Sequence, residues 1–497
     1  MWNKVVIAGG GTAGWMTAAL MAKTLCRAGF EVCLIESPTI TTVGVGEATI
    51  PSFVHFNRLL GIDEKDLLKK VKATFKLGIN FINWDKPGSD YIHGFSALGD
   101  QGPGLPFYHY WLRWQKRHPD TNIEDYFLAS SCARKNKFMH PDPAVSSLFS
   151  GLGYAYHIDA SLYAEYLKDY ATSRNVKHIK ADITDIRLNP STGYIESLRL
   201  DDATVIAGDF FIDCTGFKSL LLGGALKVPF ISWQKWLKCD RAQVVPTALT
   251  NENFVPYTKA VAQIAGWQWR IPLQHRVGNG LVYSSAYMDD NQAQSLLLSQ
   301  IDSEPLAQPR MLSFTAGMRA RFWEKNCVAV GLSSGFLEPL ESTSIHMIQS
   351  AISRLSMLFP NAETNSVLAK QFNQETSAEM EKIRDFVILH YCLNNRSKEP
   401  FWQDCQNMAL PDSLKHKLEL YRNTAYIHHD HNDVFTEGSW LSVLVGQGVL
   451  PRHSMQMINT MPDEQLDHYM KSVRHQIAAL SGQMPLHRDY IQRMLMV

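Results

Sequence analysis

Short apolar runs and helix-forming segments alternate at the start of the chain, and this pattern predicts a strand, a helix and a second strand. The apolar run 5–8 predicts the first strand, and the stretch 16–26 predicts a helix that stops near Gly29. The run EVCLIE at 31–36 predicts the second strand. Strand, helix and strand in this order form a βαβ unit, which indicates an α/β fold.

A loop and a further helix are predicted in GVGEATIPSF at 44–53. Thr49 is a suitable N-cap, Pro51 suits the first helical turn, and Gly61 marks the stop of a helix that ends near Leu60. An ordinary connection between two elements is the alternative interpretation of this stretch.

Two later segments each predict a strand that leads into a glycine turn. DFFIDCTGF at 209–217 predicts a strand ending at Asp213, and 328–330 predicts a strand that opens a loop at 331–340. A helix follows that loop. Its candidate N-caps are Ser342, Thr343 and Ser344, and its stripe of apolar residues at helical spacing is Ile345, Ile348, Ile352 and Leu355. From 361 to 497 helical patterns dominate and strand signals are few.

Composition narrows the function classes. The 48 Lys and Arg residues balance the 48 Asp and Glu residues, so the chain has no basic excess for nucleic acid or anionic lipid. The 8 cysteines form no C-x-x-C pair, which argues against a zinc site and favours reduced thiols in a cytoplasm. We therefore expect no metal site. We also expect no membrane span, because no uninterrupted apolar run reaches about 18 residues.

The turn between the first predicted strand and helix carries Gly9, Gly11 and Gly14 in the spacing G-x-G-x-x-G. Glu36 ends the next strand about 20 residues after the last glycine. In this context the glycines allow a pyrophosphate to approach a helix N-terminus, and the acid can accept hydrogen bonds from a ribose. The pattern predicts a dinucleotide site without separating FAD from NAD, and a tight turn without a ligand is the alternative.

Two further features are candidate chemistry. In GWQWRIP at 266–272, Trp267 and Trp269 point to one face of a strand, where they form either a wall or a pair of core residues. Glu341 stands just before the predicted helix N-terminus, whose free N–H groups suit an anion such as a halide or a reduced flavin. A carboxylate there can also simply favour the helix dipole, by about 0.3–1 kcal/mol.

These motifs, taken together, make the chain resemble the flavin-dependent tryptophan halogenases. GGGTAGW, GVGEATIP, TFKLGINFINW, GWQWRIP and EPLESTSI occur in that family's order, and a looser likeness continues to GQGVLP at 446–451. The resemblance implies an FAD-binding Rossmann-like α/β fold of the flavin-monooxygenase (GR2) type, with a mixed sheet and a mostly helical C-terminal part. We expect an α/β body over 1–360, in discontinuous pieces with a substrate-side sheet inserted at about 231–300, and a helical part over 361–497 that covers the substrate side.

The resemblance also implies the cofactors, FAD as FADH2, O2 and chloride or bromide, and the cofactor-binding residues, which are Gly9, Gly11, Thr12, Ala13, Gly14, Glu36, Gly46, Ala48, Asp213 and Gly331. It implies that hypohalous acid forms at the flavin and passes through a tunnel, past a wall of Trp267 and Trp269, to the catalytic Lys76. Glu341, the second catalytic residue, takes the ring proton. Thr343 and Ser344 match the halide position, although the family usually has Gly where Ser344 stands.

Substrate residues follow from the same likeness. His93 and Phe95 match residues that sandwich the substrate ring. Positions that grip free tryptophan in the family are changed here, where a rough alignment places Asn423, Thr424, Asp430, Val434 and Phe435. We therefore expect indole or a substituted indole in preference to tryptophan, with a larger indole or a phenol still open. The nearby cluster of His428, His429, Asp430, His431 and Asp433 is interpreted as a solvated loop, with a metal site as the alternative.

A separate flavin reductase is expected to supply FADH2, because no NADPH-binding segment is recognisable. A homodimer is also possible, since relatives often form one. Two rival hypotheses share the glycine motif: a flavin monooxygenase that hydroxylates an aromatic substrate, and a flavin-binding protein without catalysis. The first does not need the two tryptophans or Lys76, and the presence of Lys76 and Glu341 weighs against the second.

Overall fold

A computed structural model describes residues 2–39, 46–100, 104–142, 144, 147–250, 252, 254–430 and 433–496. The chain divides into two compact units. Unit 1 comprises 1–73, 158–240 and 313–381, and unit 2 comprises 74–157, 241–312 and 382–497. These boundaries differ from the expected division at residue 360, because 74–157 and 241–312 join the C-terminal residues in one unit.

The predicted strands of unit 1 form one six-stranded sheet in the order β20-β21-β12-β1-β2-β8. All of its neighbours are parallel except β20 and β21. The central strands are buried on both faces, which explains their continuous apolar runs. The strand bounds are Lys4–Ala8 for β1, Glu31–Glu36 for β2, Lys177–Lys180 for β8, Phe210–Asp213 for β12, Trp323–Glu324 for β20 and Cys327–Ala329 for β21.

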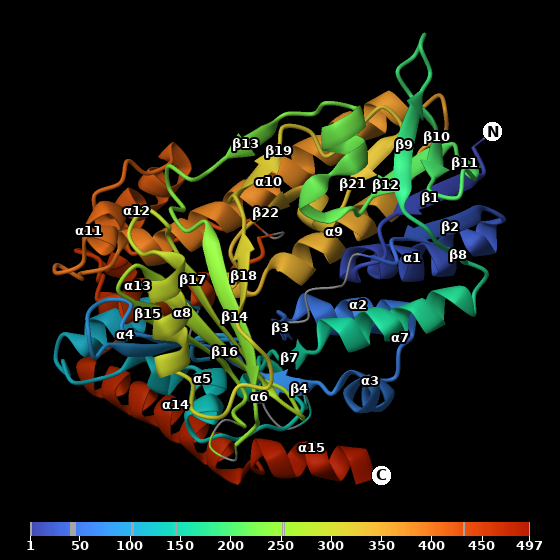
Figure 1. Ribbon diagram of the computed structural model, residues 1–497. Helices are drawn as coiled ribbons and strands as arrows, with labels where there is room; N and C mark the ends of the chain where they lie inside the picture. The colour runs from blue at the N-terminus through green and yellow to red at the C-terminus, as the bar shows by residue number, and fades with distance from the viewer. Residues whose placement is uncertain are drawn as a thin grey trace. The chain divides into compact units, whose positions relative to one another are not determined.

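The helices of unit 1 that matter for the site are α1 (Thr12–Thr24), α2 (Ser52–Leu60), α3 (Glu64–Val71), α7 (Ala160–Thr172) and α9 (Ser344–Met357). Helices α1 and α7 lie side by side (Figure 1). A 3-10 turn follows α1 and ends at Gly29 in the left-handed conformation, as predicted. The prediction of Thr49 as an N-cap is wrong, since α2 begins at Ser52 with Pro51 in the cap position and no side chain caps it.

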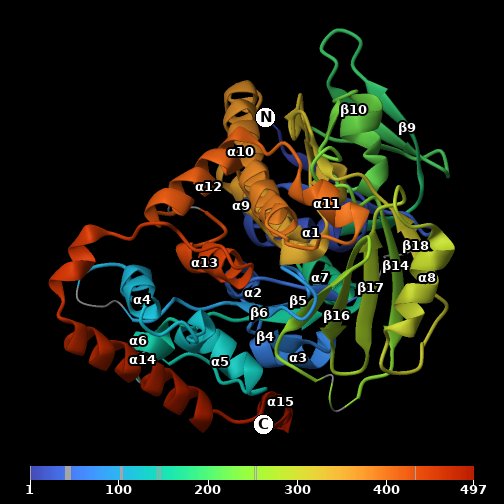
Figure 2. The ribbon, with the colours of Figure 1, turned by 90° about the vertical axis from the view of Figure 1, so that its left-hand side faces the viewer.

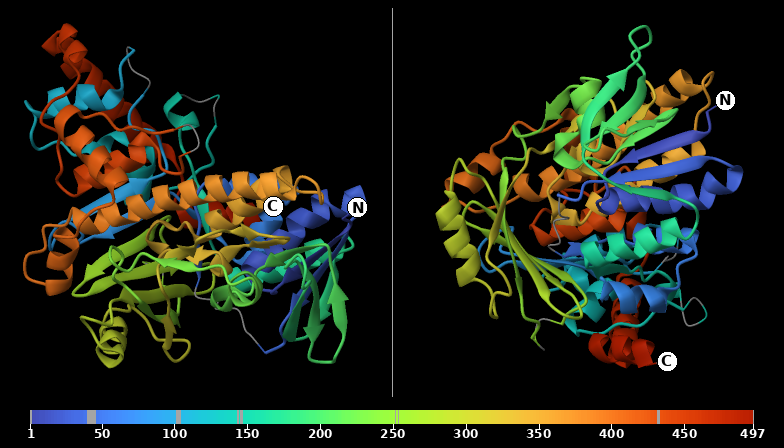
Figure 3. Two further views of the ribbon diagram at one scale, coloured as in Figure 1. Left: turned by 90° about the horizontal axis from the view of Figure 1, so that it is seen from above. Right: turned by 45° about the vertical axis from the view of Figure 1, so that its right-hand side comes forward.

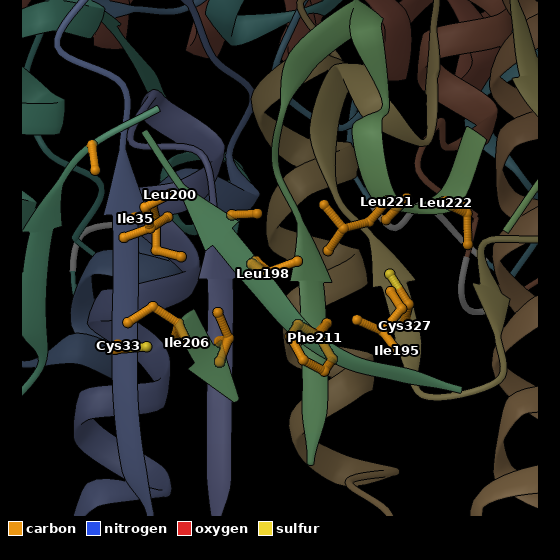
Figure 4. Packing of buried hydrophobic residues seen from close by; sticks show 14 of the residues in the cluster. Cys33, Ile35, Ile195, Leu198, Leu200, Ile206, Phe211, Leu221, Leu222 and Cys327 are labelled. Atoms are coloured by element: carbon orange, nitrogen blue, oxygen red, sulfur yellow. The ribbon is translucent and has the colours of Figure 1, made fainter. Parts of the chain in front are cut away.

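A small antiparallel sheet covers one face of the six-stranded sheet. It consists of β9 (Ile183–Leu188), β10 (Ile195–Leu200) and β11 (Val205–Ala207). Leu198 and Leu200 from β10 pack with Cys33 and Phe211 of the larger sheet (Figure 4). Leu221, from the π-helix Leu220–Ala225, belongs to the same cluster. This apolar core holds the carboxyl ends of β1 and β12 in register, and the glycine turn follows the first of them.

A third sheet of unit 1 joins β13 (Phe230–Ser232), β19 (Gly317–Arg319) and β22 (Gly335–Phe336). In unit 2, a seven-stranded sheet has the order β18-β14-β17-β16-β15-β5-β6. Its strands are β5 (Gly78–Ile82), β6 (Asp90–Gly94), β14 (Arg241–Thr247), β15 (Thr258–Gln263), β16 (Gly266–Pro272), β17 (Val277–Tyr283) and β18 (Arg310–Ser313). The sheet is mixed, as predicted, because β5 pairs parallel with β15 while β16 pairs antiparallel with both of its neighbours.

Strand β4 (Thr74–Lys76) pairs antiparallel with β7 (Ala155–Ile158). The remaining helices of unit 2 are α4 (Phe107–Gln115), α5 (Leu128–Arg134), α6 (Ser147–Ser150), α8 (Asp290–Ser299), α11 (Pro400–Gln406), α12 (Asp412–Thr424), α13 (Glu437–Gly446), α14 (Asp463–Gln483) and α15 (His487–Met496). Helix α14 packs on α4 and α5 (Figure 2).

The long helix α10 (Asn365–Cys392) begins in unit 1 and ends in unit 2 (Figure 3). From α10 onward every described element is helical, which confirms the predicted helical C-terminal part. Within the described ranges, no helix combines the length and the apolar character that crossing a membrane requires.

Candidate functional site

The glycine turn of unit 1 lies between β1 and α1, as predicted. Gly9 has a φ of 109°, and a Cβ there would lie 2.2 Å from the carbonyl oxygen of Cys214. A Cβ on Gly14 would lie 1.9 Å from the Gly9 carbonyl oxygen, so the first turn of α1 packs directly on the strand end. Gly11 differs, because a Cβ there meets no protein atom within 4 Å. The turn therefore presents open space at the N-terminus of α1, which suits a phosphate group.

Glu36 ends β2 beside this turn. A Cβ on Gly10 would lie 2.4 Å from the Glu36 Cγ, so only glycine at that position leaves room for the carboxylate. The carboxylate makes a 2.7 Å contact with His178 Nε2. Burial lowers the pKa of His178, while the hydrogen bond to Glu36 acts in the opposite direction. Glu36 thus lies where a ribose-binding acid is expected and already has one partner within the fold.

Asp213 is fully buried at the end of β12, and both of its carboxylate oxygens are used within the fold. Oδ1 accepts hydrogen bonds from the backbone and hydroxyl of Thr215, at 3.0 and 2.6 Å. Oδ2 accepts from the backbone N–H groups of Leu221 and Leu222, at 3.0 and 2.8 Å. This carboxylate organises the turn and the start of the π-helix, so any contact of this segment with a cofactor is expected through the backbone rather than through the acid.

The other predicted cofactor residues surround the same turn. Thr12 and Ala13 are the first residues of α1, and a Cβ on Gly331 would lie 2.8 Å from the Ala13 Cβ. Gly331, with a φ of 73°, therefore brings the loop after β21 against the glycine turn. Gly46 has a φ of 80° and Ala48 is buried, whereas the preceding part of the GVGEATIP motif lies outside the described residues.

Glu341 and the predicted halide residues form a continuous segment before α9. Glu341 ends a 3-10 turn (Pro339–Glu341) and is fully buried, and Ser342 adopts the left-handed conformation with a φ of 59°. Thr343 occupies the N-cap position of α9 without making a capping bond, and its buried Oγ1 has no hydrogen-bond partner. A buried hydroxyl without a partner is rare in a native fold and is accounted for when a ligand binds there. Helix α9 buries the predicted stripe of Ile345, Ile348, Ile352 and Leu355.

A partly buried polar network in unit 1 was not predicted. Ser52 Oγ lies 2.9 Å from His346 Nδ1, and His346 Nε2 lies 2.9 Å from Glu379 Oε1. Glu379 also accepts hydrogen bonds from Ser350 and Arg354, at 2.6 and 2.9 Å. The network ties the first residue of α2 to the first turn of α9 and to α10. No motif could have indicated it, because its members are far apart in the sequence and each residue type is common.

In unit 2, Lys76 lies in β4 and is fully buried, with Nζ 5.1 Å from the centroid of the Phe95 ring. Thr74 in the same strand donates a 2.7 Å hydrogen bond to the carbonyl of Pro272, so its oxygen accepts from His157 Nδ1. His157 Nε2 then accepts from Thr258, and burial, reinforced by the nearby Lys76 charge, holds the His157 pKa well below its ordinary value. A neutral histidine thus connects the strand of Lys76 to β15 and to the end of the W-x-W-x-I-P strand.

Trp267 and Trp269 point to one face of β16 and are both buried, with ring centroids 5.9 Å apart. Trp269 stands opposite Gly280 of β17, and a Cβ on that glycine would lie 2.1 Å from the Trp269 ring. The absence of a side chain at Gly280 therefore creates the space in which the indole lies. The Trp269 Nε1 is buried without a hydrogen-bond partner.

The predicted substrate residues belong to one aromatic cluster. The His93 ring lies 6.1 Å from Phe95, 5.8 Å from Phe386 and 6.3 Å from Phe435, measured between ring centroids. Phe386 and Phe435 are stacked at 3.8 Å. Lys76, over the face of Phe95, is thus in contact with this cluster.

Of the positions that the family uses to grip tryptophan, Phe435 belongs to this cluster, whereas Asn423 and Thr424 lie on α12 and Asp430 lies in the segment after it. Asn423 and Thr424 are exposed, and their side chains hydrogen-bond to carbonyls of their own helix at 2.8 and 2.7 Å. Asp430 is ion-paired with Lys382. His431 lies outside the described residues, and in the part of the chain that the structure describes no three His, Cys, Asp or Glu side chains gather as a metal site would require.

The predicted residues divide between the units. The glycine turn, Glu341, Thr343 and Ser344 belong to unit 1, and Lys76, His93, Phe95, Trp267 and Trp269 belong to unit 2. That Lys76 and Glu341 face one pocket, and that a tunnel passes the tryptophan pair, both stay predictions.

Comparisons with known proteins cover nearly the whole chain. A family model described as tryptophan halogenase matches residues 4–463. Tryptophan 6-halogenase from Streptomyces toxytricini is 35% identical over 477 residues, covering 90% of each chain. The solved structure of a flavin-dependent halogenase from Xanthomonas campestris has a TM-score of 0.95 at 43% identity, covering 99% of this chain and 98% of that one. A flavin-dependent halogenase from Brevundimonas sp. BAL3 also has a TM-score of 0.95, at 41% identity and 99% coverage of both chains.

Proposed function

This chain belongs to the tryptophan halogenase family, a family of flavin-dependent enzymes, and from that premise we propose that it halogenates indole or a substituted indole in preference to free tryptophan. The reaction replaces an aromatic C–H bond with a C–X bond, where X is chlorine or bromine. Hypohalous acid supplies X⁺ to the ring carbon. The proton that leaves this carbon combines with the hydroxide of the acid to form water.

Reduced FAD is the proposed cofactor, delivered by a separate flavin reductase. When bound, it would supply the two electrons that reduce one oxygen atom of O2 to water, while the other oxygen atom oxidises the halide to hypohalous acid. The glycine turn supports this assignment, because the open space at Gly11 adjoins the helix N-terminus while Gly9 and Gly14 are packed against backbone. Ala13 and Gly331 place a second backbone segment beside the same turn. These residues are proposed to hold the pyrophosphate and to fix the position of the flavin.

The halide is proposed to bind at Thr343 and Ser344. The unpartnered Thr343 hydroxyl is a donor available to an anion, and the N–H groups of the first turn of α9 face the same end of that helix. Ser344 provides a backbone N–H regardless of its side chain, so replacing the family's glycine leaves this donor in place. Glu341, two residues upstream of Thr343, is proposed to take the proton that the halogenated ring must lose.

Lys76 is proposed to hold hypohalous acid after it has passed through a tunnel walled by Trp267 and Trp269. The observation that carries the proposal is the burial of the Lys76 ammonium against Phe95, inside the aromatic cluster that includes His93. An ammonium in a dry aromatic site interacts strongly with a polar oxidant, because water does not screen it. The cluster offers faces on which an electron-rich ring can stack.

The preference for an indole without the amino-acid group rests on two residues of α12 and on Asp430 in the segment after it. Asn423 and Thr424 hydrogen-bond to carbonyls of their own helix, and Asp430 is paired with Lys382, so each side chain is engaged within the fold, which disfavours a grip on the tryptophan ammonium or carboxylate.

The proposal is tested by incubating the protein with a flavin reductase, FAD, NADH, O2, bromide or chloride, and either indole or tryptophan, and analysing the products by mass spectrometry. We expect halogenated indole in excess over halogenated tryptophan. Lys76→Ala should reduce turnover by roughly 100-fold or more while flavin binding, measured by fluorescence titration, is retained. Lys86→Ala, which changes an exposed lysine of the same unit, is the matched control.

A hydroxylated product without halogen would indicate a monooxygenase instead. Full turnover in Lys76→Ala would contradict the role proposed for the lysine, and halogenated tryptophan in excess would contradict the substrate preference.

A further inference from the structure

A pocket of about 490 Å³ lies within unit 2, between the end of α10, α12, described residues of 426–430 and 433–435, and the start of α13. Its size falls in the range of roughly 300–1,000 Å³ that is typical of sites for small organic molecules. The glycine turn and the halide segment, which belong to unit 1, contribute no residue to its lining.

The walls of this pocket are largely apolar, and one of them is shared with the substrate cluster. Ile383, Leu414, Phe435 and Trp440 are among the lining residues. Phe435 also contacts His93, and it stacks on Phe386. Phe435 therefore borders both this pocket and a ring bound against His93.

Most of the charged groups that line the pocket are already paired. The Lys382 ammonium contacts the carboxylates of both Asp430 and Asp433 at 2.5 Å. Asp385 is held by Arg384 at 2.8 Å and accepts a hydrogen bond from Ser413. The lining carboxylates thus have cationic or hydroxyl partners, and a ligand ammonium would have to displace one of these.

Lys417 is different. Its Nζ lies 4.3 Å from the centroid of the Trp440 ring, and it forms no hydrogen bond or ion pair with any described residue. The side chain is half-buried, and burial lowers the pKa of its ammonium despite the more distant carboxylates of Asp433 and Asp385. A partly desolvated ammonium with three donors and no direct acceptor is suited to a carboxylate ligand.

We infer that this pocket binds a carboxylate-bearing arm of the aromatic substrate, with the Lys417 ammonium on the carboxylate and the Phe435 and Trp440 rings along the arm. The inference rests on the proposed function, because it takes the ring held at His93 as the one that is halogenated. It names the substrate class as indoles with an alkanoic acid arm. Free tryptophan fits less well, since its α-ammonium finds the pocket carboxylates already paired.

The test is a binding measurement by isothermal titration calorimetry, without flavin, using indole-3-butyrate, its methyl ester and tryptamine. We expect the acid to bind roughly tenfold or more tightly than the ester, as a charge-assisted hydrogen bond predicts. Lys417→Met should abolish this preference, whereas Lys415→Met, an exposed lysine on the same helix, should retain it. Circular dichroism of both variants shows whether the fold is kept.

The inference is overturned if the wild-type protein binds acid and ester equally, if Lys417→Met retains the preference, or if tryptamine binds more tightly than the acid. The halogenation assay on indole separates this failure from failure of the proposed function. Halogenated indole without acid preference removes only the inference, and acid preference without any halogenation removes only the proposed function.

In the same halogenation assay, the acid should show a lower KM than the ester, and Lys417→Met should bring the two KM values together. This split between substrates is not expected from a merely structural role of Lys417, which would change both KM values alike.

Discussion

Replacing Glu379 by Gln tests how the partly buried network of unit 1 supports the predicted flavin and halide segments. Glu379 accepts hydrogen bonds from His346, Ser350 and Arg354, and its side chain is only 16% exposed. Burial alone would raise the pKa of this carboxyl, but these partners lower it from its ordinary 4.5 to about 2. The charged form is therefore stabilised by folding, and Gln removes the charge while keeping the size and shape of the side chain.

The magnitude follows from the pKa values. Each tenfold difference in proton affinity between the folded and unfolded states is worth about 1.4 kcal/mol, so ionised Glu379 contributes about 3 kcal/mol to the free energy of unfolding. Because the folded-state pKa is the lower one, this contribution is complete above the unfolded-state value of 4.5. It is lost as the pH falls toward 2, so the difference between wild type and Glu379→Gln should shrink from about 3 kcal/mol at pH 7 to about 1 kcal/mol at pH 3.

The assay is urea unfolding followed by pulsed hydrogen exchange of peptides from α9, which reports on unit 1 separately from unit 2. Glu375→Gln is the matched control, since Glu375 lies on the same helix and pairs with the same Arg354, at 2.9 Å, but is 44% exposed. An exposed pair of this kind contributes about 0–1 kcal/mol. Equal destabilisation by the two substitutions, or a Glu379→Gln effect that does not change between pH 7 and pH 3, would refute this reasoning.

Two glycine contacts give further predictions. Gly14→Ala should lower the melting temperature, because the new Cβ meets the Gly9 carbonyl oxygen at 1.9 Å, whereas Gly11→Ala should fold normally and weaken only flavin binding, since no protein atom lies within 4 Å. Thermal melts and flavin titrations of both variants check this, and equal melting temperatures would contradict it. Gly280→Ala should displace the Trp269 ring and destabilise the protein by about 1–3 kcal/mol, measured by urea unfolding, while flavin binding is unchanged.

Features with a local periodic signal were predictable from the sequence. The strands around the glycine turn are continuous apolar runs because the parallel sheet buries them on both faces. The buried stripe of α9 has helical spacing because only one face of that helix is buried. The start of α2 was misjudged by two residues, because Pro51 itself takes the cap position and no side chain caps the helix. A helix start that no side chain caps has no characteristic capping residue by which the sequence could reveal it.

The unit boundaries depend on contacts that no local pattern records. Strand β5 pairs in parallel with β15, which brings 79–82 beside 258–261 and places 74–157 in unit 2. The same holds for Ser52, His346 and Glu379, which three separate elements bring together. Asp213 shows a different limit, because a conspicuous acid after a strand invites a ligand role, whereas its oxygens are used by the turn itself.

The division of the predicted chemistry between two units determines how a loss of activity can be interpreted. All residues of the glycine turn lie in unit 1, and Lys76, Trp269 and Lys417 lie in unit 2. A substitution in unit 2 that abolishes halogenation while flavin still binds must therefore act on the path of the oxidant or on the aromatic substrate. If such substitutions instead released flavin together with activity, the two units would have to be coupled, and Lys76 could not be assigned a role in the chemistry from its loss alone.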